Sequence, residues 1–151
     1  MTRFGWLFEG GAKGKRRAPA VDREGQEQAA YFEWLGKALP LVSDHAFHPA
    51  NGGHRLKAVA GKLKAQGVRA GVPDIYIELP RGAYHGLRIE LKATPPHDAA
   101  VAPSQKAWRA RLKGAGYCAL ICKGWEAAKS ATEAYVSLGP FDGTTRLELD
   151  A

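Results

Sequence analysis

The fold of this chain is decided by two short stretches, Gly71-Val72-Pro73-Asp74-Ile75-Tyr76-Ile77 and Gly86-Leu87-Arg88-Ile89-Glu90-Leu91-Lys92. Both read as β-strands, over 72–77 and 86–92, with a turn between them. Because side chains alternate faces along a strand, Glu90 and Lys92 point the same way and their apolar neighbours point the other way. A carboxylate and an ammonium group in the middle of an apolar strand are costly to bury unless they pair or hold a metal ion.

A second carboxylate, Asp74, opens the first strand. If the two strands pair as a hairpin, Asp74 and Glu90 converge on one divalent ion, and few, hard oxygen ligands favour Mg²⁺ or Mn²⁺. The backbone carbonyl of Leu91 is a candidate further ligand. Lys92 has the reach to orient an attacking water or to neutralise charge on a phosphate. These residues predict a metal-dependent phosphodiesterase. The alternative is a structural ion pair between Glu90 and Lys92 on an edge strand.

The composition indicates one globular domain with a basic surface. The chain has 151 residues, a formal net charge of +7 and a pI near 9.6. Such a charge favours a polyanionic partner, and nucleic acid is favoured over a membrane because no amphipathic or lipidation motif accompanies it. No apolar run has the length of a signal peptide or a membrane span, so we expect a cytoplasmic protein that is not secreted. Cys118 and Cys122 are expected to be buried, reduced thiols.

The positive charge falls in clusters around the two carboxylates. Residues 45–73 contain no acidic residue at all. Any one basic cluster could be a solvated helix face, and the turn at Asn51-Gly52 could be an ordinary Asn-Gly turn without a ligand. Several basic clusters around one acidic site nevertheless favour contacts with phosphates. The residues expected to bind nucleic acid are Lys15, Arg16 and Arg17 in an N-terminal arm, His48, Asn51 and Gly53 in a turn, and Arg55, Lys57, Lys62, Lys64 and Arg69 in and after the following helix.

Periodicity and turn residues predict an α/β fold with the element order α-β-α-β-β-α-β-α. The helix over 55–66 is expected to pack through an inner face of Leu56, Val59, Ala60 and Leu63. We expect a basic flexible arm over 1–21, a folded domain over 22–137 and an acidic tail over 138–151. The expected helices are 22–39, 55–66, 103–115 and 125–135; the expected strands are 44–48, 72–77, 86–92 and 117–122, with a possible terminal strand over 145–149.

Two further polar residues lie on helices at suggestive positions. Gln105 shares a helix face with Trp108, where an amide is either buried with local partners or directed at the site. Glu24 and Glu27 lie at the start of the first helix, where the helix dipole favours carboxylates. The functional alternative makes one of them a third acidic group beside the metal ion.

Taken in order, these motifs resemble the PD-(D/E)xK nuclease superfamily, and within it the VRR-NUC domain of the virus-type replication-repair nucleases. The resemblance runs from about Glu24 to Tyr135. A Pro-Asp pair with a Glu-x-Lys motif is a weak signal alone, but the whole series is specific. The series comprises Glu24 and Gln28, the turn 48–53, Gly71-Val72-Pro73-Asp74, Ile89-Glu90-Leu91-Lys92, Gln105 with Trp108, and Gly116-Tyr117.

The resemblance implies a restriction-endonuclease-like core with a mixed central sheet flanked by helices, and Mg²⁺- or Mn²⁺-dependent cleavage of DNA. By position, Asp74, Glu90 and Lys92 match the catalytic triad, Gln105 the motif glutamine and Glu24 the first-helix acid. Because small phage and bacterial members of the family are homodimers and some act on four-way (Holliday) junctions, the resemblance also implies a homodimer and a structured or branched DNA substrate. Two alternatives stay open: a nucleic-acid-binding protein whose metal site is vestigial, and a nuclease that acts on RNA.

Overall fold

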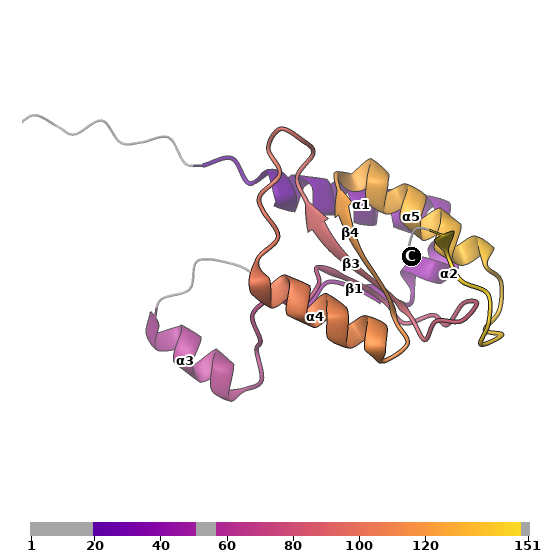
Figure 1. The fold of residues 1–151 in the computed structure, drawn as a ribbon. Coiled ribbons are helices and arrows are strands. Elements are labelled where there is room, and N and C mark those ends of the chain that lie inside the picture. Colours follow the sequence, from indigo (N-terminus) through magenta and orange to yellow (C-terminus); the bar gives the residue numbers. More distant parts are fainter. Residues whose placement is uncertain (1–19, 51–56, 149–151) are drawn as a thin grey trace, which may run out of the picture.

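The computed structural model describes residues 20–50 and 57–148. Its centre is a four-stranded mixed sheet with the strand order β1-β2-β3-β4 (Figure 1). β1, β2 and β3 pair antiparallel, and β3 and β4 pair parallel. The sequence therefore predicts the class and the mixed sheet correctly. The strands are β1 (Ala46–Phe47), β2 (Ile75–Ile77), β3 (Leu87–Lys92) and β4 (Cys118–Lys123).

Helices lie on both sides of this sheet. α1 and α5 pack together on one side, α4 packs along β4 on the other, and α3 projects away from the sheet (Figure 1). A short helix, α2, follows α1 directly and was not predicted. It begins at Pro40, a residue that suits the first turn of a helix. The helices are α1 (Arg23–Ala38), α2 (Pro40–Ser43), α3 (Lys57–Ala65), α4 (Pro103–Gly114) and α5 (Trp125–Ser137).

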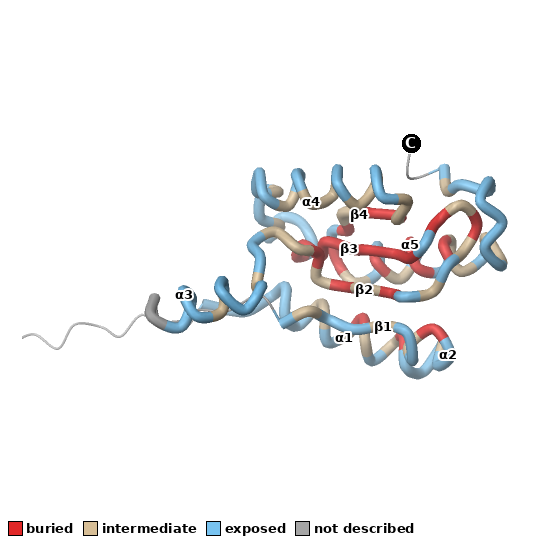
Figure 2. Tube along the Cα trace, turned by 90° about the horizontal axis from the view of Figure 1, so that it is seen from below, coloured by how far each residue is buried: buried red, intermediate tan, exposed pale blue. Residues whose placement is uncertain are grey.

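The hydrophobic core lies between the sheet and the α1–α5 pair (Figure 2). Strand pairing aligns Ile75 with Ile89 and Ile89 with Leu120, so that one row of apolar side chains crosses three strands. From α1, Tyr31 is buried over this row, and its hydroxyl bonds Thr132 Oγ1 of α5 at 2.7 Å. The core therefore covers the face of β3 that carries Ile89, and the polar residues of β3 lie on the opposite face.

Two expectations about the periphery are wrong. Residues 145–148 form no strand; Thr145 instead closes a turn in which its N–H donates to Asp142 Oδ1 at 2.9 Å. The inner face expected for α3 is largely exposed: Val59 is 45% exposed, Ala60 is exposed, and Leu63 is only half-buried. Helical periodicity identifies an apolar stripe but does not say what covers it. Leu56 lies outside the described residues.

The two cysteines, Cys118 and Cys122, are buried in β4 and form no disulfide bond, as expected. Among the described residues, no helix has the length and apolar character needed to cross a membrane.

Candidate active site

The end of the β2–β3 hairpin brings Asp74 against the middle of β3. The Asp74 N–H donates to the Ile89 carbonyl at 3.0 Å, which continues the strand pairing by one residue beyond β2. The Leu91 N–H then donates to the carboxylate oxygen Asp74 Oδ2 at 2.8 Å. Because the side chain takes the place of a backbone acceptor, the Asp74 carboxylate is held at the point where the two strands separate.

Glu90 and Lys92 lie on the face of β3 that the core does not use. Both are buried, at 7% and 4% exposure, and Lys92 Nζ is 3.3 Å from Glu90 Oε1. The predicted alternation of faces is therefore confirmed. β3 is a central strand, between β2 and β4, so the alternative of an ion pair on an edge strand does not describe this site.

Burial alters the acidity of both carboxyl groups, and the charge of Asp74 adds to the effect on Glu90. Burial, followed by the negative charge of Asp74, raises the pKa of Glu90 to about 7. Burial also raises the pKa of Asp74, against the opposing effect of the Leu91 hydrogen bond. Two carboxylates that each cost free energy to ionise form a site where a divalent cation would replace the missing solvation.

Gln105 connects this pair to α4. Its Nε2 donates to Glu90 Oε1, and its Oε1 accepts from the Ala102 N–H at 2.8 Å. The second bond is half of a capping box, so Gln105 stabilises the first turn of α4, whose N-cap residue is an alanine. The structure thus places Gln105 at the site and gives it a local structural role as well.

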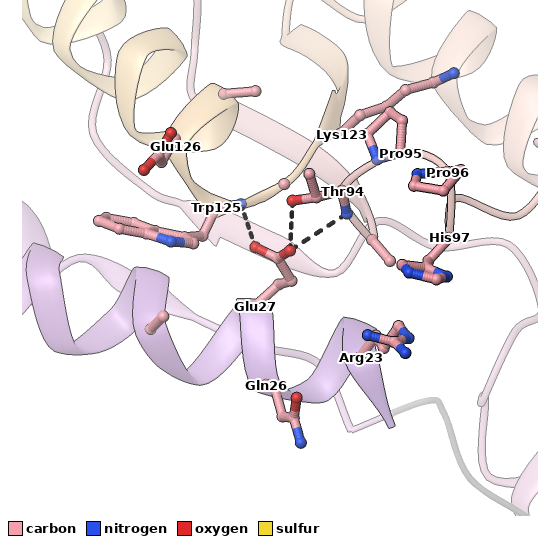
Figure 3. A pocket seen from close by; sticks show the side chains of 14 residues that line it. Arg23, Gln26, Glu27, Thr94, Pro95, Pro96, His97, Lys123, Trp125 and Glu126 are labelled. Atoms are coloured by element: carbon pink, nitrogen blue, oxygen red, sulfur yellow. Dashed lines mark hydrogen bonds between the residues drawn. The ribbon is translucent and has the colours of Figure 1, made fainter. Parts of the chain in front are cut away.

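The two acids of α1 occupy different environments. Glu24 is exposed, and it lies near enough to Glu90 to raise the pKa of that group. Glu27 instead accepts hydrogen bonds from Trp125 N–H at 2.8 Å and from Thr94 N–H at 3.2 Å and Oγ1 at 2.5 Å (Figure 3). Glu27 thereby joins α1 to the end of β3 and to the start of α5. Glu24 is the one that remains available to the site.

Glu27 lines a large hollow near the site. That hollow, about 740 Å³, lies between α1, the loop after β3 and the start of α5 (Figure 3). Both carboxylate oxygens of Glu27 are occupied by the hydrogen bonds already described. A smaller hollow of about 160 Å³ contains the carboxylates themselves. Its lining includes His48, Arg69, Asp74, Glu90 and Gln105. The smaller hollow is therefore the candidate active site.

The basic residues predicted to contact nucleic acid are only partly described. His48 Nδ1 lies 2.6 Å from the Asp74 carbonyl oxygen, which fixes the turn beside the carboxylates. Arg69 is exposed at the rim and donates to the Lys64 carbonyl at 3.1 Å. Lys62 and Lys64 are exposed on α3, which Lys57 opens. The remaining candidates lie outside the described residues: Lys15, Arg16, Arg17, Asn51, Gly53 and Arg55.

The donor set suits a small, hard cation. Among the described residues, no group of three or more His, Cys, Asp or Glu side chains is placed to hold one ion. Asp74 and Glu90 would therefore be the protein's side-chain ligands. The Leu91 carbonyl points to the same edge of β3 as its N–H, which is bonded to Asp74. Two carboxylates, one carbonyl and open positions for water and phosphate match the preferences of Mg²⁺ and exclude a closed structural zinc site.

Residues on the same face were missed by the sequence reasoning. Arg88 is buried between the rings of Tyr76 and Tyr117, at 4.4 and 4.3 Å from their centroids. The alternation that puts Glu90 and Lys92 on one face also puts Arg88 there, so the signal was available in the sequence. Gly71, at φ 84°, is a second such residue, because the sequence shows it only as one member of a motif. A Cβ at this position would lie 2.5 Å from the Ser104 carbonyl carbon.

Comparison with known proteins agrees with this geometry. The VRR-NUC domain family matches residues 19–126. The chain belongs to the VRR-NUC family. A solved structure described as a VRR_NUC domain protein shares 33% identity, with a TM-score of 0.74, over 85% of this chain and 100% of the other. No curated protein matches the chain. Membership of the family implies a nuclease-type function, with DNA as the expected substrate class.

Proposed function

We propose that this protein is a Mg²⁺- or Mn²⁺-dependent endonuclease that hydrolyses phosphodiester bonds in DNA. One observation carries the proposal: the carboxylates of Asp74 and Glu90 converge in one small hollow, with the ammonium group of Lys92 3.3 Å from Glu90. A divalent ion bound there would polarise the scissile phosphate and lower the pKa of a bound water.

The side chains around the carboxylates have separate roles in this proposal. Lys92 lies where it can orient the attacking water and stabilise negative charge that develops on the phosphate. Gln105 holds the Glu90 carboxylate in one orientation through its hydrogen bond. Glu24, the exposed acid of α1, adds negative charge near the site and is available to a second ion or to a water ligand.

The substrate shape and the oligomeric state are extensions of the proposal. We propose a branched DNA substrate, such as a four-way junction, and a homodimer; the resemblance to small VRR-NUC proteins supports both. Two buried thiols that form no disulfide bond agree with a reducing, cytoplasmic location. Sedimentation velocity at micromolar concentration tests the dimer, and a monomer at all concentrations would contradict it.

Cleavage by the wild type and by Asp74→Ala tests the activity. The substrates are single-stranded, duplex, flap and four-way-junction DNA, with an RNA strand for comparison, in Mg²⁺, Mn²⁺ and EDTA. We expect metal-dependent cutting by the wild type only, with DNA binding kept or improved in the variant because a negative charge is removed. Lost binding with retained cleavage would contradict the assignment. Tight binding without cutting would favour the alternative, a binding protein with a vestigial site.

A further inference from the structure

A row of stacked side chains crosses the sheet on the same face as the carboxylates. We call Phe47, Tyr76, Arg88 and Tyr117 the aromatic row. The rings of Phe47 and Tyr76 lie 5.2 Å apart at 31°, and the Arg88 guanidinium lies over the Tyr76 ring at 4.4 Å. Strand register produces this arrangement, because Phe47 pairs with Tyr76 and Tyr76 pairs with Arg88.

The inner part of the aromatic row is held firmly. Arg88 is 4% exposed, pairs with Glu78 at 2.6 Å and donates to the Leu87 carbonyl at 3.1 Å. Gly86 leaves space for the guanidinium, since a Cβ there would lie 2.9 Å from Arg88 Nη1 and 3.4 Å from a carbon of the Tyr117 ring. The Arg88 guanidinium against the Tyr76 ring leaves that ring little freedom. A flat group that stacks at the open end of the row therefore meets side chains that are already ordered, which favours its binding.

The open end of the aromatic row is Phe47, and it lies beside the candidate site. Phe47 is 47% exposed on β1, which is an edge strand of the sheet. Tyr76 is two residues from Asp74 on one strand, which places the row about 7 Å from the carboxylates along the strand. The next residue after Phe47, His48, contacts Asp74 and lines the small hollow. A group stacked on Phe47 would thus be a close neighbour of a phosphate at the site.

The chemistry of this surface fits a nucleic-acid base better than a protein. The large apolar side chains that are exposed in the described part of the chain lie on separate segments: Val21, Leu41, Phe47, Val59 and Phe141. A single exposed ring is far smaller than the surface that a stable protein interface buries. It does match the flat face of one base, and base–aromatic stacking tolerates any base sequence.

We propose that Phe47, backed by Tyr76 and Arg88, stacks on an unpaired base of a DNA strand whose neighbouring phosphate occupies the Asp74–Glu90 site. This proposal rests on the proposed nuclease function and adds a source of substrate preference. A base inside a duplex is already stacked and paired, so it reaches Phe47 only at a cost. Single strands, flaps and branch points present such a base without that cost.

Binding measurements test the proposal without requiring cleavage. The affinities of the full chain for labelled single-stranded, flap and duplex DNA are measured by fluorescence anisotropy in Ca²⁺. Phe47→Leu keeps an apolar side chain but removes the flat ring, and Phe47→Trp keeps a flat ring. We expect Phe47→Leu to lower the ratio of single-strand to duplex affinity roughly 5-fold or more, and Phe47→Trp to preserve that ratio.

A second phenylalanine supplies a matched control. Phe141 is 50% exposed and stacks on His85 at 5.6 Å, but it lies at the turn end of the hairpin, where it forms a bridge with Gly82. Phe141→Leu is expected to leave the affinity ratio unchanged. Melting by circular dichroism shows whether each variant is folded; if Phe47→Leu is not, Phe47→Tyr and Phe47→Met make the same comparison of flat and non-flat side chains.

Abasic substitution locates the stacked base. When single bases of the flap strand are removed in turn, one position should abolish the difference between wild type and Phe47→Leu. A ratio of single-strand to duplex affinity that is the same in Phe47→Leu as in the wild type would overturn the proposal, even if both affinities fall. So would a shift from dimer to monomer in Phe47→Leu, because the ring would then belong to an interface between copies. Absence of cleavage by the wild type would refute the proposed function. The affinity ratios would still show whether a base stacks on Phe47.

Discussion

The backbone N–H of Leu91 donates a 2.8 Å hydrogen bond to the carboxylate of Asp74. This bond continues the β2–β3 pairing through a side chain after the backbone ladder has ended. It holds a carboxylate beside Glu90 on a central strand, where neither group is well solvated. The proposed metal site is thus built at the end of a hairpin by ordinary strand register.

Substitutions of Gln105 should separate its two hydrogen bonds. Gln105→Ala loses both, so we expect a stability loss of about 1 kcal/mol from the helix cap and a roughly tenfold or larger loss of cleavage rate. Gln105→Glu keeps the acceptor for the Ala102 N–H but loses the donor to Glu90. It also places a third carboxylate against Glu90, which already repels Asp74, so we expect Gln105→Glu to lose activity at least as strongly as Gln105→Ala. Wild-type cleavage by Gln105→Glu would show that the bond to Glu90 has no role in catalysis.

Glu24 and Glu27 provide a matched pair on one helix. Glu27→Gln weakens the acceptor that joins α1 to Thr94 and Trp125, and we expect a loss of roughly 1–3 kcal/mol in unfolding free energy. Glu24→Gln should leave the melting temperature within about 1–2 °C of wild type, because the side chain is exposed, while cleavage falls. Thermal melting and cleavage of one substrate, measured on both variants, check this. Reversed effects would exchange the roles assigned to the two acids.

Gly71 is required by two independent constraints. Its φ of 84° is strained for other residues, and a Cβ would lie 2.5 Å from the Ser104 carbonyl carbon in α4. Gly71→Ala should lower the unfolding free energy by about 1–3 kcal/mol and shift the turn before Asp74. At Gly114, the last residue of α4, an added Cβ would meet nothing within 4 Å beyond its own helix, and Gly114→Ala should be neutral or slightly stabilising. Chemical denaturation of both variants makes the comparison.

The acidity of Glu90 predicts an unusual dependence of stability on pH. A glutamate titrates near 4.5 when unfolded, whereas the pKa of Glu90 in the folded protein is about 7. Between these values the folded state holds a proton that the unfolded state has lost, so stability falls as pH rises. Protonated Glu90 therefore contributes on the order of 3 kcal/mol to the free energy of unfolding. This contribution is fully present below about pH 4.5 and is lost above about pH 7.

Melting in EDTA at several pH values measures this effect. Glu90→Gln should remove it, and Asp74→Asn should reduce it because the neighbouring negative charge is gone. Added Mg²⁺ should stabilise the wild type more at pH 8 than at pH 6, since the ion binds the ionised carboxylates. A wild-type melting temperature that rises steadily from pH 5 to pH 8 in EDTA would contradict the assignment.

The sequence predicts the site better than it predicts the periphery. Alternation along β3 places Glu90 and Lys92 correctly, because a two-residue period leaves only one choice of face once Ile89 is buried. Helical spacing puts Gln105 on one face with Trp108 but leaves open whether its amide has local partners or is directed at the site; in the structure it bonds both Ala102 and Glu90. These are local rules, and they hold wherever an element is regular.

What the sequence does not reveal depends on contacts between distant segments. The apolar stripe of α3 stays largely exposed, and the tail forms a turn around Asp142 rather than a strand. Glu27 looks like an ordinary helix-start carboxylate until its partners Thr94 and Trp125 are known. The aromatic row requires the register of three strands, which no single stretch of sequence specifies.

Binding of Mn²⁺ to the wild type and to Asp74→Asn, followed by electron paramagnetic resonance, tests the central claim most directly. The substitution preserves the shape of the side chain and removes one charge from the proposed ligand pair. We predict that the wild type binds Mn²⁺ and that Asp74→Asn binds it at least tenfold more weakly, with Asp142→Asn as an exposed control that leaves the affinity unchanged. Equal affinity in the wild type and Asp74→Asn would show that Asp74 and Glu90 do not form the metal site.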